Sequence, residues 1–210
     1  MQRIGEILQN FPTGTPSHPQ TPVLMPLLPP LSEMAKSLNV NIDHTFTSIK
    51  EVPGITPVVR AIQETIAGPR FMALIYGGVG NGKTHLMEAA SIELYKRGRV
   101  ARVVTFSKIL SVLKSAIANP EKDYEQILSN YCSTPQAIID DIGAGGSDTD
   151  FGAKILETIV CARYGRELLT IMSTNKDIEN IPERVLSRLK DKSTSFLIFN
   201  KAEDYRPKLV

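Results

Sequence analysis

The chain has 210 residues, of which 42% are hydrophobic and 22% are charged, a composition that predicts one globular domain with a packed core and a tail. A formal net charge of +2 excludes a protein that coats nucleic acid through bulk charge, so any DNA contact must come from a local patch. Cys132 and Cys161 are the only two cysteines, and neither belongs to a His/Cys cluster. This argues against structural zinc and disulfides and is typical of a cytoplasmic protein.

Residues 1–45 are expected to form an N-terminal arm. Residues 1–11 place apolar side chains at helical spacing, which indicates either a frayed terminal turn or a short helix that docks on a partner protein. Seven of the 14 prolines lie between Pro12 and Pro30. Because proline removes a backbone donor and restricts φ, this stretch predicts a flexible, extended linker. The prolines also interrupt the apolar stretch at 23–31, so we expect no signal peptide and no membrane span.

The remainder, residues 46–210, alternates helical patterns with short apolar runs. In chain order the pattern predicts a helix over 57–68, a strand over 71–76, a helix over 83–96, a strand over 100–105, helices over 107–118 and 121–132, a strand over 137–140, a helix over 151–164, a strand over 168–173, a helix over 182–189 and a strand over 194–199. Ser107 is the expected N-cap of the third helix. Strands that alternate with helices predict an α/β fold, a parallel sheet with helices on both faces.

The segment between the strand at 71–76 and the helix at 83–96 matches the phosphate-binding pattern GxxxxGK[ST]. It comprises Gly77, Gly78, Val79, Gly80, Asn81, Gly82, Lys83 and Thr84. Glycines let successive backbone N–H groups point at one centre, and the helix N-terminus adds partial positive charge. We therefore expect an ATP site in which Lys83 reaches the β- and γ-phosphates and the Thr84 hydroxyl ligates Mg²⁺.

The apolar strand at 137–140 ends in two acids, Asp140 and Asp141. Because ligands bind at the carboxyl edge of a parallel sheet, these acids are expected beside the phosphate-binding loop. Asp140 is the predicted Mg²⁺ partner, directly or through water, and Asp141 is placed to orient or deprotonate an attacking water. Asn175 follows the next strand and could hold that water or the γ-phosphate, although an asparagine after a strand is usually a turn residue.

Arg184 and Arg188 are four residues apart and therefore share a helix face. The face is either simply solvated or supplies an arginine to the γ-phosphate of a neighbouring subunit. Such an arginine accelerates related NTPases by a factor of roughly 10³ or more. If the arginine is supplied to a neighbouring subunit, the protein is an ATPase that self-associates.

The motifs GGVGNGKTHL, AIIDDIG, IMSTN and PERVLSRL, in this order and spacing, resemble the AAA+ helicase loaders of the DnaC/DnaI type and the related IstB transposition ATPases. The resemblance implies a P-loop AAA+ domain over 46–210, with a five-stranded parallel sheet of order 5-1-4-3-2 and no substantial C-terminal lid. The short ending resembles the loaders and argues against a full initiator of the DnaA kind, which shares the GKTHL run.

The same resemblance assigns roles to single residues. It makes the loop through Thr84, together with His85, the Walker A nucleotide site, and Asp140 the Walker B metal residue. Asp141 takes the position of the catalytic acid, Asn175 that of sensor one, and Arg188 that of the arginine finger. Most AAA+ proteins carry Glu where Asp141 stands, so hydrolysis is expected to be slow or partner-stimulated.

Three functions fit these residues. The first is an ATP-dependent loader that binds a replicative DNA helicase and delivers it to single-stranded DNA, with residues 1–45 as the docking arm. The second is an IstB-like transposition helper that acts on duplex DNA and a transposase. The third is a nucleotide-dependent switch with negligible turnover, suggested by Asp141. Five basic residues lie near one another in the sequence, namely Lys96, Arg97, Arg99, Arg102 and Lys108. They could contact DNA phosphates or form an ordinary solvated surface.

Overall fold

The computed structural model describes residues 28–49, 53–143 and 149–204. The predicted docking helix at 1–11 and most of the proline-rich linker lie outside the described residues. Within the described ranges, no helix is both long enough and apolar enough to cross a membrane.

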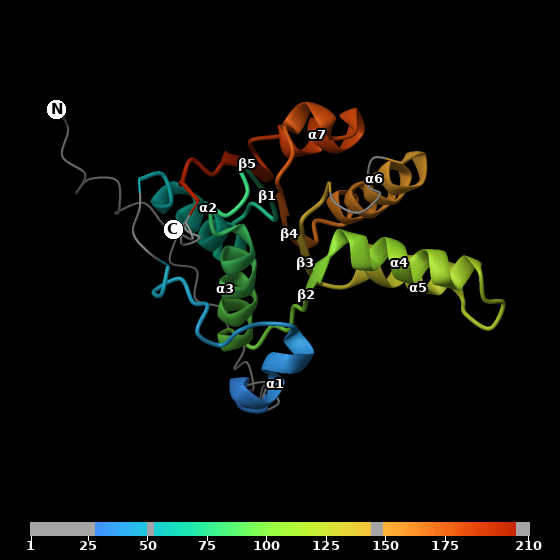
Figure 1. The fold of residues 1–210 in the computed structure, drawn as a ribbon, viewed down its shortest axis with the longest axis horizontal. Coiled ribbons are helices and arrows are strands. Elements are labelled where there is room, and N and C mark those ends of the chain that lie inside the picture. The colour runs from blue at the N-terminus through green and yellow to red at the C-terminus, as the bar shows by residue number, and fades with distance from the viewer. Residues whose placement is uncertain (1–27, 50–52, 144–148, 205–210) are drawn as a thin grey trace, which may run out of the picture.

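A five-stranded parallel sheet forms the centre of the fold (Figure 1). Its strands are β1 (Met72–Tyr76), β2 (Val103–Thr105), β3 (Gln136–Asp140), β4 (Leu169–Thr174) and β5 (Ser195–Phe199). The order across the sheet is β2-β3-β4-β1-β5, and every neighbouring pair is parallel. This is the predicted order 5-1-4-3-2 read from the other edge, so the predicted architecture is confirmed. Every residue of β4 is buried, as a strand covered on both faces requires.

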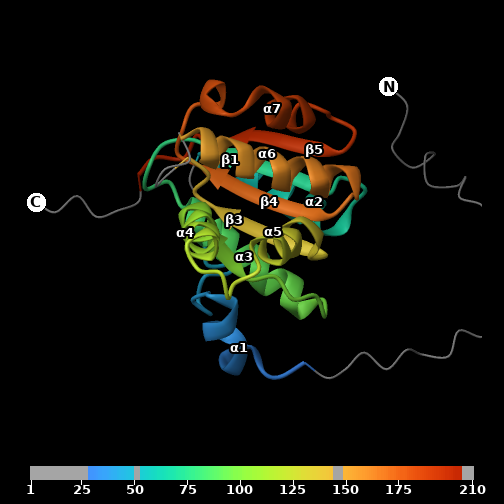
Figure 2. The same ribbon diagram turned by 90° about the vertical axis from the view of Figure 1, so that its right-hand side faces the viewer.

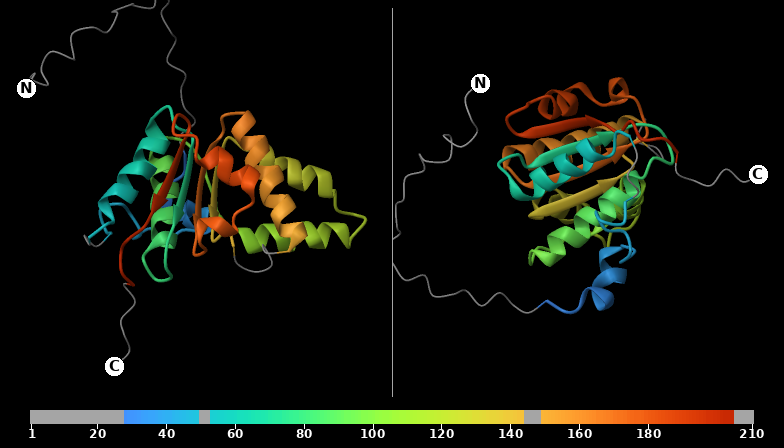
Figure 3. Two further views of the ribbon diagram at one scale, coloured as in Figure 1. Left: turned by 90° about the horizontal axis from the view of Figure 1, so that it is seen from above. Right: turned by 90° about the vertical axis from the view of Figure 1, so that its left-hand side faces the viewer.

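Helices cover both faces of the sheet (Figure 3). One face carries α2 (Thr56–Ala67) and α3 (Lys83–Lys96), and the other carries α4 (Phe106–Ile117), α5 (Tyr124–Ser133), α6 (Asp150–Gly165) and α7 (Glu183–Leu189). Two hydrophobic cores result because successive strand residues point to opposite faces. In β1, Met72 and Leu74 join the core under α4 to α7, whereas Ala73 and Ile75 join the core under α2 and α3.

Most predicted elements lie within a few residues of their predicted bounds, and α3 has the bounds that the pattern predicts. The N-cap of α4 is a correction. It is Thr105, whose side chain accepts a hydrogen bond from the Lys108 backbone N at 3.3 Å, and not Ser107. The reason is that β2 runs directly into α4. Thr105 keeps the extended backbone that a cap needs, while Ser107 already lies in the first helical turn.

Two short helices were not predicted, namely α1 (Leu31–Leu38) and the 3₁₀ turn η2 (Ile178–Asn180). Figures 1 and 2 place α1 beside the end of α3 on the β2 side of the sheet. Leu38 is buried, and the side chain of Asn39 donates a 3.0 Å hydrogen bond to the carbonyl of Val103 in the edge strand β2. Residues before 46 therefore contribute to the folded unit.

Candidate functional site

The loop 77–82 joins β1 to α3 at the carboxyl edge of the sheet and borders a cleft of about 500 Å³. Gly82 is the N-cap of α3 and has φ 85°, in the left-handed region that favours glycine. This conformation turns the loop directly into the helix, so the backbone N–H groups of the first helical turn face the cleft. The strand, loop and helix context that the motif requires is therefore present.

Lys83 is buried, and its ammonium group lies inside the loop. The Nζ atom donates to the Gly77 carbonyl at 2.9 Å, to the Gly78 carbonyl, and to Asn81 Oδ1 at 2.8 Å. A positive charge is thus held where the backbone N–H groups and the positive end of α3 converge, which is the environment that an anion such as a phosphate requires.

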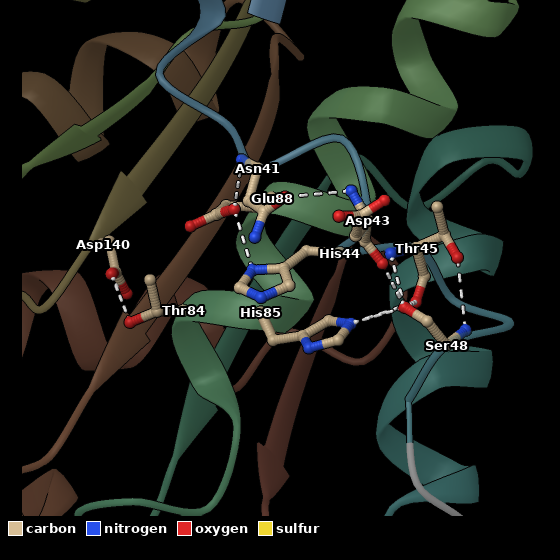
Figure 4. A network of polar contacts seen from close by, with 9 residues as sticks. All are labelled: Asn41, Asp43, His44, Thr45, Ser48, Thr84, His85, Glu88 and Asp140. Carbon is tan, nitrogen blue, oxygen red and sulfur yellow. Dashed lines mark hydrogen bonds and ion pairs between the residues drawn. The ribbon is translucent and has the colours of Figure 1, made fainter. Parts of the chain in front are cut away.

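Asp140 ends β3, and its carboxylate lies between two hydroxyl groups. Thr84 Oγ1 donates to Asp140 Oδ2 at 2.8 Å (Figure 4), and Ser173 Oγ at the end of β4 donates to Asp140 Oδ1. Among the described residues, no three His, Cys, Asp or Glu side chains form a metal cage. One hydroxyl and one carboxylate side by side fit Mg²⁺, which is usually held by few protein ligands together with water and substrate phosphates.

Asp141 and Asn175 also line the cleft. Asn175 Nδ2 donates to Asp141 Oδ1 at 2.9 Å, and the Asp141 backbone N donates to Ser173 Oγ at 3.0 Å. Asp141 has φ 56°, a left-handed conformation that is uncommon for a residue with a side chain and is often found at functional sites. The predicted catalytic acid and the predicted sensor residue are therefore in direct contact.

Three polar residues of this region do not stand out in the sequence. Ser173 bonds to Asp140, and Thr105 lines the cleft because it pairs in register with Asp140 across β2 and β3. Asn200 follows β5 and is buried against the loop. A signal was available for the first two, because Thr105 is the last residue of β2 and Ser173 the last but one of β4, at the edge of a parallel sheet where ligands bind.

His85, in the first turn of α3, stacks on His44 with ring centroids 4.2 Å apart (Figure 4). Its Nε2 lies 3.1 Å from the carbonyl of Thr45 and 3.2 Å from Ser48 Oγ. Burial lowers the pKa of His85, the hydrogen bond to Thr45 raises it to a smaller extent, and nearby His44 lowers it further. His44 Nδ1 in turn lies 2.9 Å from Glu88 Oε2. The segment before α2 is thereby attached beside the phosphate-binding loop.

Arg188 does not line its own chain's cleft. Its carbonyl accepts a 3.0 Å hydrogen bond from Ser195, the first residue of β5, so Arg188 lies toward the amino edge of the sheet, opposite the loop. Its Nη1 donates to the Arg184 carbonyl at 2.7 Å, and its guanidinium lies 5.6 Å from the Tyr164 ring centroid. Arg184 is exposed and pairs with Glu157 at 2.9 Å.

The basic residues that are close in sequence do not form one patch. Lys96 and Arg97 lie at the end of α3, on the amino edge of the sheet, whereas Lys108 lies in the first turn of α4, on the carboxyl edge. Arg97 pairs with Glu93 at 2.8 Å, and Arg99 donates to a backbone carbonyl of α2. The strand β2 runs between the two groups, so the cluster suggested for DNA phosphates is split.

Comparison with known proteins identifies the family to which the chain is similar. A family model described as the bacterial DnaA ATPase domain matches residues 55–193. The chromosomal replication initiator protein DnaA of Zymomonas mobilis subsp. mobilis is 30% identical over 119 residues, which cover 55% of this chain and 24% of that protein. The chain thus spans about a quarter of the length of this curated relative.

Solved structures share the fold. AMPPCP-bound DnaA from Aquifex aeolicus superposes with a TM-score of 0.65 at 20% identity, covering 77% of this chain and 51% of that chain. A crystal structure of the DnaC helicase loader gives 0.62 at 20% identity, covering 80% and 100%, and one of DnaI gives 0.62 at 18% identity, covering 82% and 93%. At these identities the likeness concerns the fold.

The family model and the curated relative are both of the DnaA kind, whereas structures of loaders share the fold. The predicted resemblance to loaders rested on four motifs in their order and spacing and on the short ending, and the family model matches the core that carries these motifs. The match covers about two thirds of the residues. This chain belongs to the family of the bacterial DnaA ATPase domain and is an AAA+ ATP-binding domain.

Proposed function

We propose that this domain binds ATP together with Mg²⁺ in the cleft beside the loop 77–84 and hydrolyses it slowly or on stimulation by a partner. The observation that carries the proposal is that one cleft collects an inserted ammonium group, a hydroxyl–carboxylate pair and an acid–amide pair. The fold likeness to DnaA bound to AMPPCP, a nucleotide analogue, supports it.

Each group has a distinct task in this proposal. Lys83 and the backbone N–H groups of the loop bind the β- and γ-phosphates. Thr84 and Asp140 would hold Mg²⁺, which supplies positive charge that offsets the charge of the phosphates. Asp141 accepts a hydrogen bond from a water molecule and orients it toward the γ-phosphate, and Asn175 fixes the Asp141 carboxylate.

Asp141 is also the reason to expect slow turnover. Its side chain is one methylene shorter than the glutamate of most AAA+ proteins, and Asn175 already occupies one of its oxygens at 2.9 Å. A carboxylate held back from the phosphates orients water less well unless a partner closes the site. If Asp141 orients the water too poorly for hydrolysis even with a partner, the domain acts as a nucleotide-dependent switch with negligible turnover.

Arg188 is proposed to act on the nucleotide of a neighbouring subunit. It lies toward the edge of the sheet opposite its own cleft, and so it could complete only another chain's site. Among the described residues its Nε atom is buried without a hydrogen-bond partner. Because buried polar groups are normally satisfied, this nitrogen is a candidate to gain a partner on assembly.

At the level of the whole protein, we propose a cytoplasmic replication factor that loads a replicative helicase onto single-stranded DNA. The fold likeness to the DnaC helicase loader supports the loading role, and the likeness to a replication initiator DnaA bound to AMPPCP and single-stranded DNA supports the DNA contact. The N-terminal arm ahead of α1 is proposed as the docking element, with residues 1–11 as its contact with the helicase.

The test mixes the purified protein with the replicative helicase of its own host and ATP, and weighs the products by native mass spectrometry. A truncated variant lacks residues 1–27, which leaves α1 and the contact between Tyr95 and the Pro29 carbonyl in place. A matched full-length variant carries serine at the apolar positions Ile4, Ile7 and Leu8.

A defined helicase complex that both variants lose supports the loader and the docking arm. A complex that both variants retain contradicts the docking role of the arm and leaves the loader standing. A parallel mixture contains duplex DNA, a transposase of the same host and ATP. If no helicase complex forms and this mixture gives ATP-dependent assemblies, the loader is wrong and the transposition helper takes its place.

A further inference from the structure

Asn200 immediately follows β5 and is only 1% exposed. Its backbone N donates to the carbonyl of Tyr76, the last residue of β1, at 2.7 Å. Its side-chain oxygen accepts from the backbone N of Ala202 at 3.1 Å. The residue is thereby held rigidly where β1 turns into the phosphate-binding loop.

Asn200 and Asn81 form a reciprocal pair across 119 residues of sequence. Asn200 Nδ2 donates to the Asn81 carbonyl at 2.8 Å, and Asn81 Nδ2 donates to the Asn200 carbonyl at 3.2 Å. Asn81 is also 1% exposed. Hydrogen bonds that are shielded from water in this way are stronger than exposed ones, and their members are costly to leave unpaired.

The pair leads directly to the ammonium group of the site. Asn81 uses its amide nitrogen for Asn200, and its amide oxygen accepts from Lys83 Nζ at 2.8 Å. The orientation of one side chain therefore links the end of β5 to the lysine that the phosphates require. Asn200, just after β5, is thus connected through Asn81 to the charge of Lys83 in the first turn of α3.

The loop also packs too tightly against this segment to move independently. A Cβ atom on Gly77 would lie 2.6 Å from the Asn200 carbonyl oxygen and 3.0 Å from Asn81 Nδ2. A Cβ atom on Gly80 would lie 1.9 Å from Asp204 Oδ1. The residues after β5 therefore form one wall of the loop, and the backbone contact with Asn200 requires glycine at position 77.

We propose that Asn200 is a positioning residue of the phosphate-binding loop, which holds Asn81 and through it Lys83 in the arrangement that receives phosphates. The inference rests on the proposed ATP binding and deepens it. A loop that is ordered before binding does not lose conformational freedom when the nucleotide arrives, so the affinity of the site depends on this distant contact.

The experiment measures the Kd of a fluorescent ATP analogue with Mg²⁺ for the full chain and for Asn200→Ala, Asn81→Ala and the double variant. Asn200→Asp is a second variant: it keeps the shape and the acceptor for Ala202, and it replaces the donor to the Asn81 carbonyl by a buried carboxyl oxygen that cannot donate when ionised. Thr65→Val is the matched control. It removes a buried 2.8 Å hydrogen bond within α2, away from the loop. Circular dichroism fixes a temperature at which every variant is folded.

The expected result is a loss of affinity of about tenfold for Asn200→Ala, the effect of one or two buried hydrogen bonds. The double variant should bind no more weakly than Asn81→Ala alone, because Asn200 is proposed to act on Lys83 through the Asn81 side chain, which the single variant Asn81→Ala already lacks. Thr65→Val should bind within about twofold of the unmodified chain while losing thermal stability, which separates positioning from general stability.

The outcomes distinguish the two proposals. If the unmodified chain binds no nucleotide, the proposed function is wrong and the inference fails with it. If the unmodified chain binds and folded Asn200→Ala and Asn200→Asp bind equally well, the inference alone is wrong. Losses that multiply in the double variant would show two independent residues and would also overturn it.

Discussion

The hydroxyl of Thr84 donates a 2.8 Å hydrogen bond to the carboxylate of Asp140, which lies 56 residues further along the chain. Thr84 follows β1 and Asp140 ends β3, yet β4 lies between these two strands in the sheet. The contact forms because α3 leans over β4 as it leaves the loop, and Ser173 at the end of β4 bonds to the same carboxylate. Two oxygen ligands suited to Mg²⁺ are thus brought together by the strand order.

Replacement of Lys83 by alanine is expected to weaken the binding of an ATP analogue roughly 100-fold, because two charge-assisted contacts to phosphate are lost. Equilibrium fluorescence titration measures the effect. Lys96→Ala is the control, since Lys96 is an exposed residue at the opposite end of the same helix. If the Lys83→Ala variant binds the ATP analogue as tightly as the unmodified chain, the nucleotide does not bind in the cleft beside Lys83.

Asp141→Asn is expected to lower ATP turnover by roughly 10² or more while the Kd for ATP changes little, because the carboxylate acts on water and not on the phosphates. Turnover is followed by phosphate release. Asp177→Asn makes the same change of charge at an exposed position just beyond Asn175 and should have no effect. If the unmodified chain has no measurable turnover and Asp141→Asn leaves it unchanged, the domain is a switch.

Mixtures of Arg188→Ala and Lys83→Ala subunits should recover part of the activity that each variant lacks alone. In a mixed assembly, the intact nucleotide site of an Arg188→Ala subunit lies next to the intact arginine of a Lys83→Ala subunit. Such an arginine raises the rate of hydrolysis by a factor of roughly 10³. Turnover is measured across mixing ratios. Lys190→Ala, an exposed change just after α7, should retain full activity. Mixtures that never exceed the sum of their parts contradict the assignment of Arg188.

Arg163→Ala is expected to lower the free energy of unfolding by on the order of 3 kcal/mol, because several buried acceptors lose their donor. The side chain is 0% exposed and donates to Thr170 Oγ1 at 2.8 Å and to the carbonyls of Thr134 and Leu169 at 2.8 Å. Burial lowers its pKa to about 10. Urea unfolding tests the prediction against Arg166→Ala, an exposed neighbour that should be nearly neutral.

Thermal stability should fall as the pH falls below the usual His85 pKa of 6.5. Burial lowers the pKa of folded His85, so between the two pKa values the unfolded chain takes up a proton that the folded chain does not, which favours unfolding. His44 and Glu88 also face this site. The melting temperature of His85→Gln should decrease less than that of the unmodified chain between pH 7.5 and 5.5. Parallel decreases would contradict the prediction.

Periodicity and glycine placement were sufficient to predict most of the helices and strands. The apolar run at 71–76 and the pattern at 83–96 are signals that depend on neighbouring residues alone, and the loop between them has a shape that few sequences satisfy. Such signals weaken where an element is short. The helix α1 contains eight residues and is held by contacts with α3 and β2, so its own sequence does not predict it.

The sequence by itself determined the parallel α/β class, the phosphate-binding loop and the two acids at a strand end, because each depends on local residue types and spacing. The tertiary structure alone decided which distant groups meet: the Asn81–Asn200 pair, the contact of Asp141 with Asn175, and the separation of Lys108 from Lys96. The physical reason is that these relations depend on strand order and register. A long-range hydrogen bond forms only where packing brings a donor and an acceptor within about 3 Å.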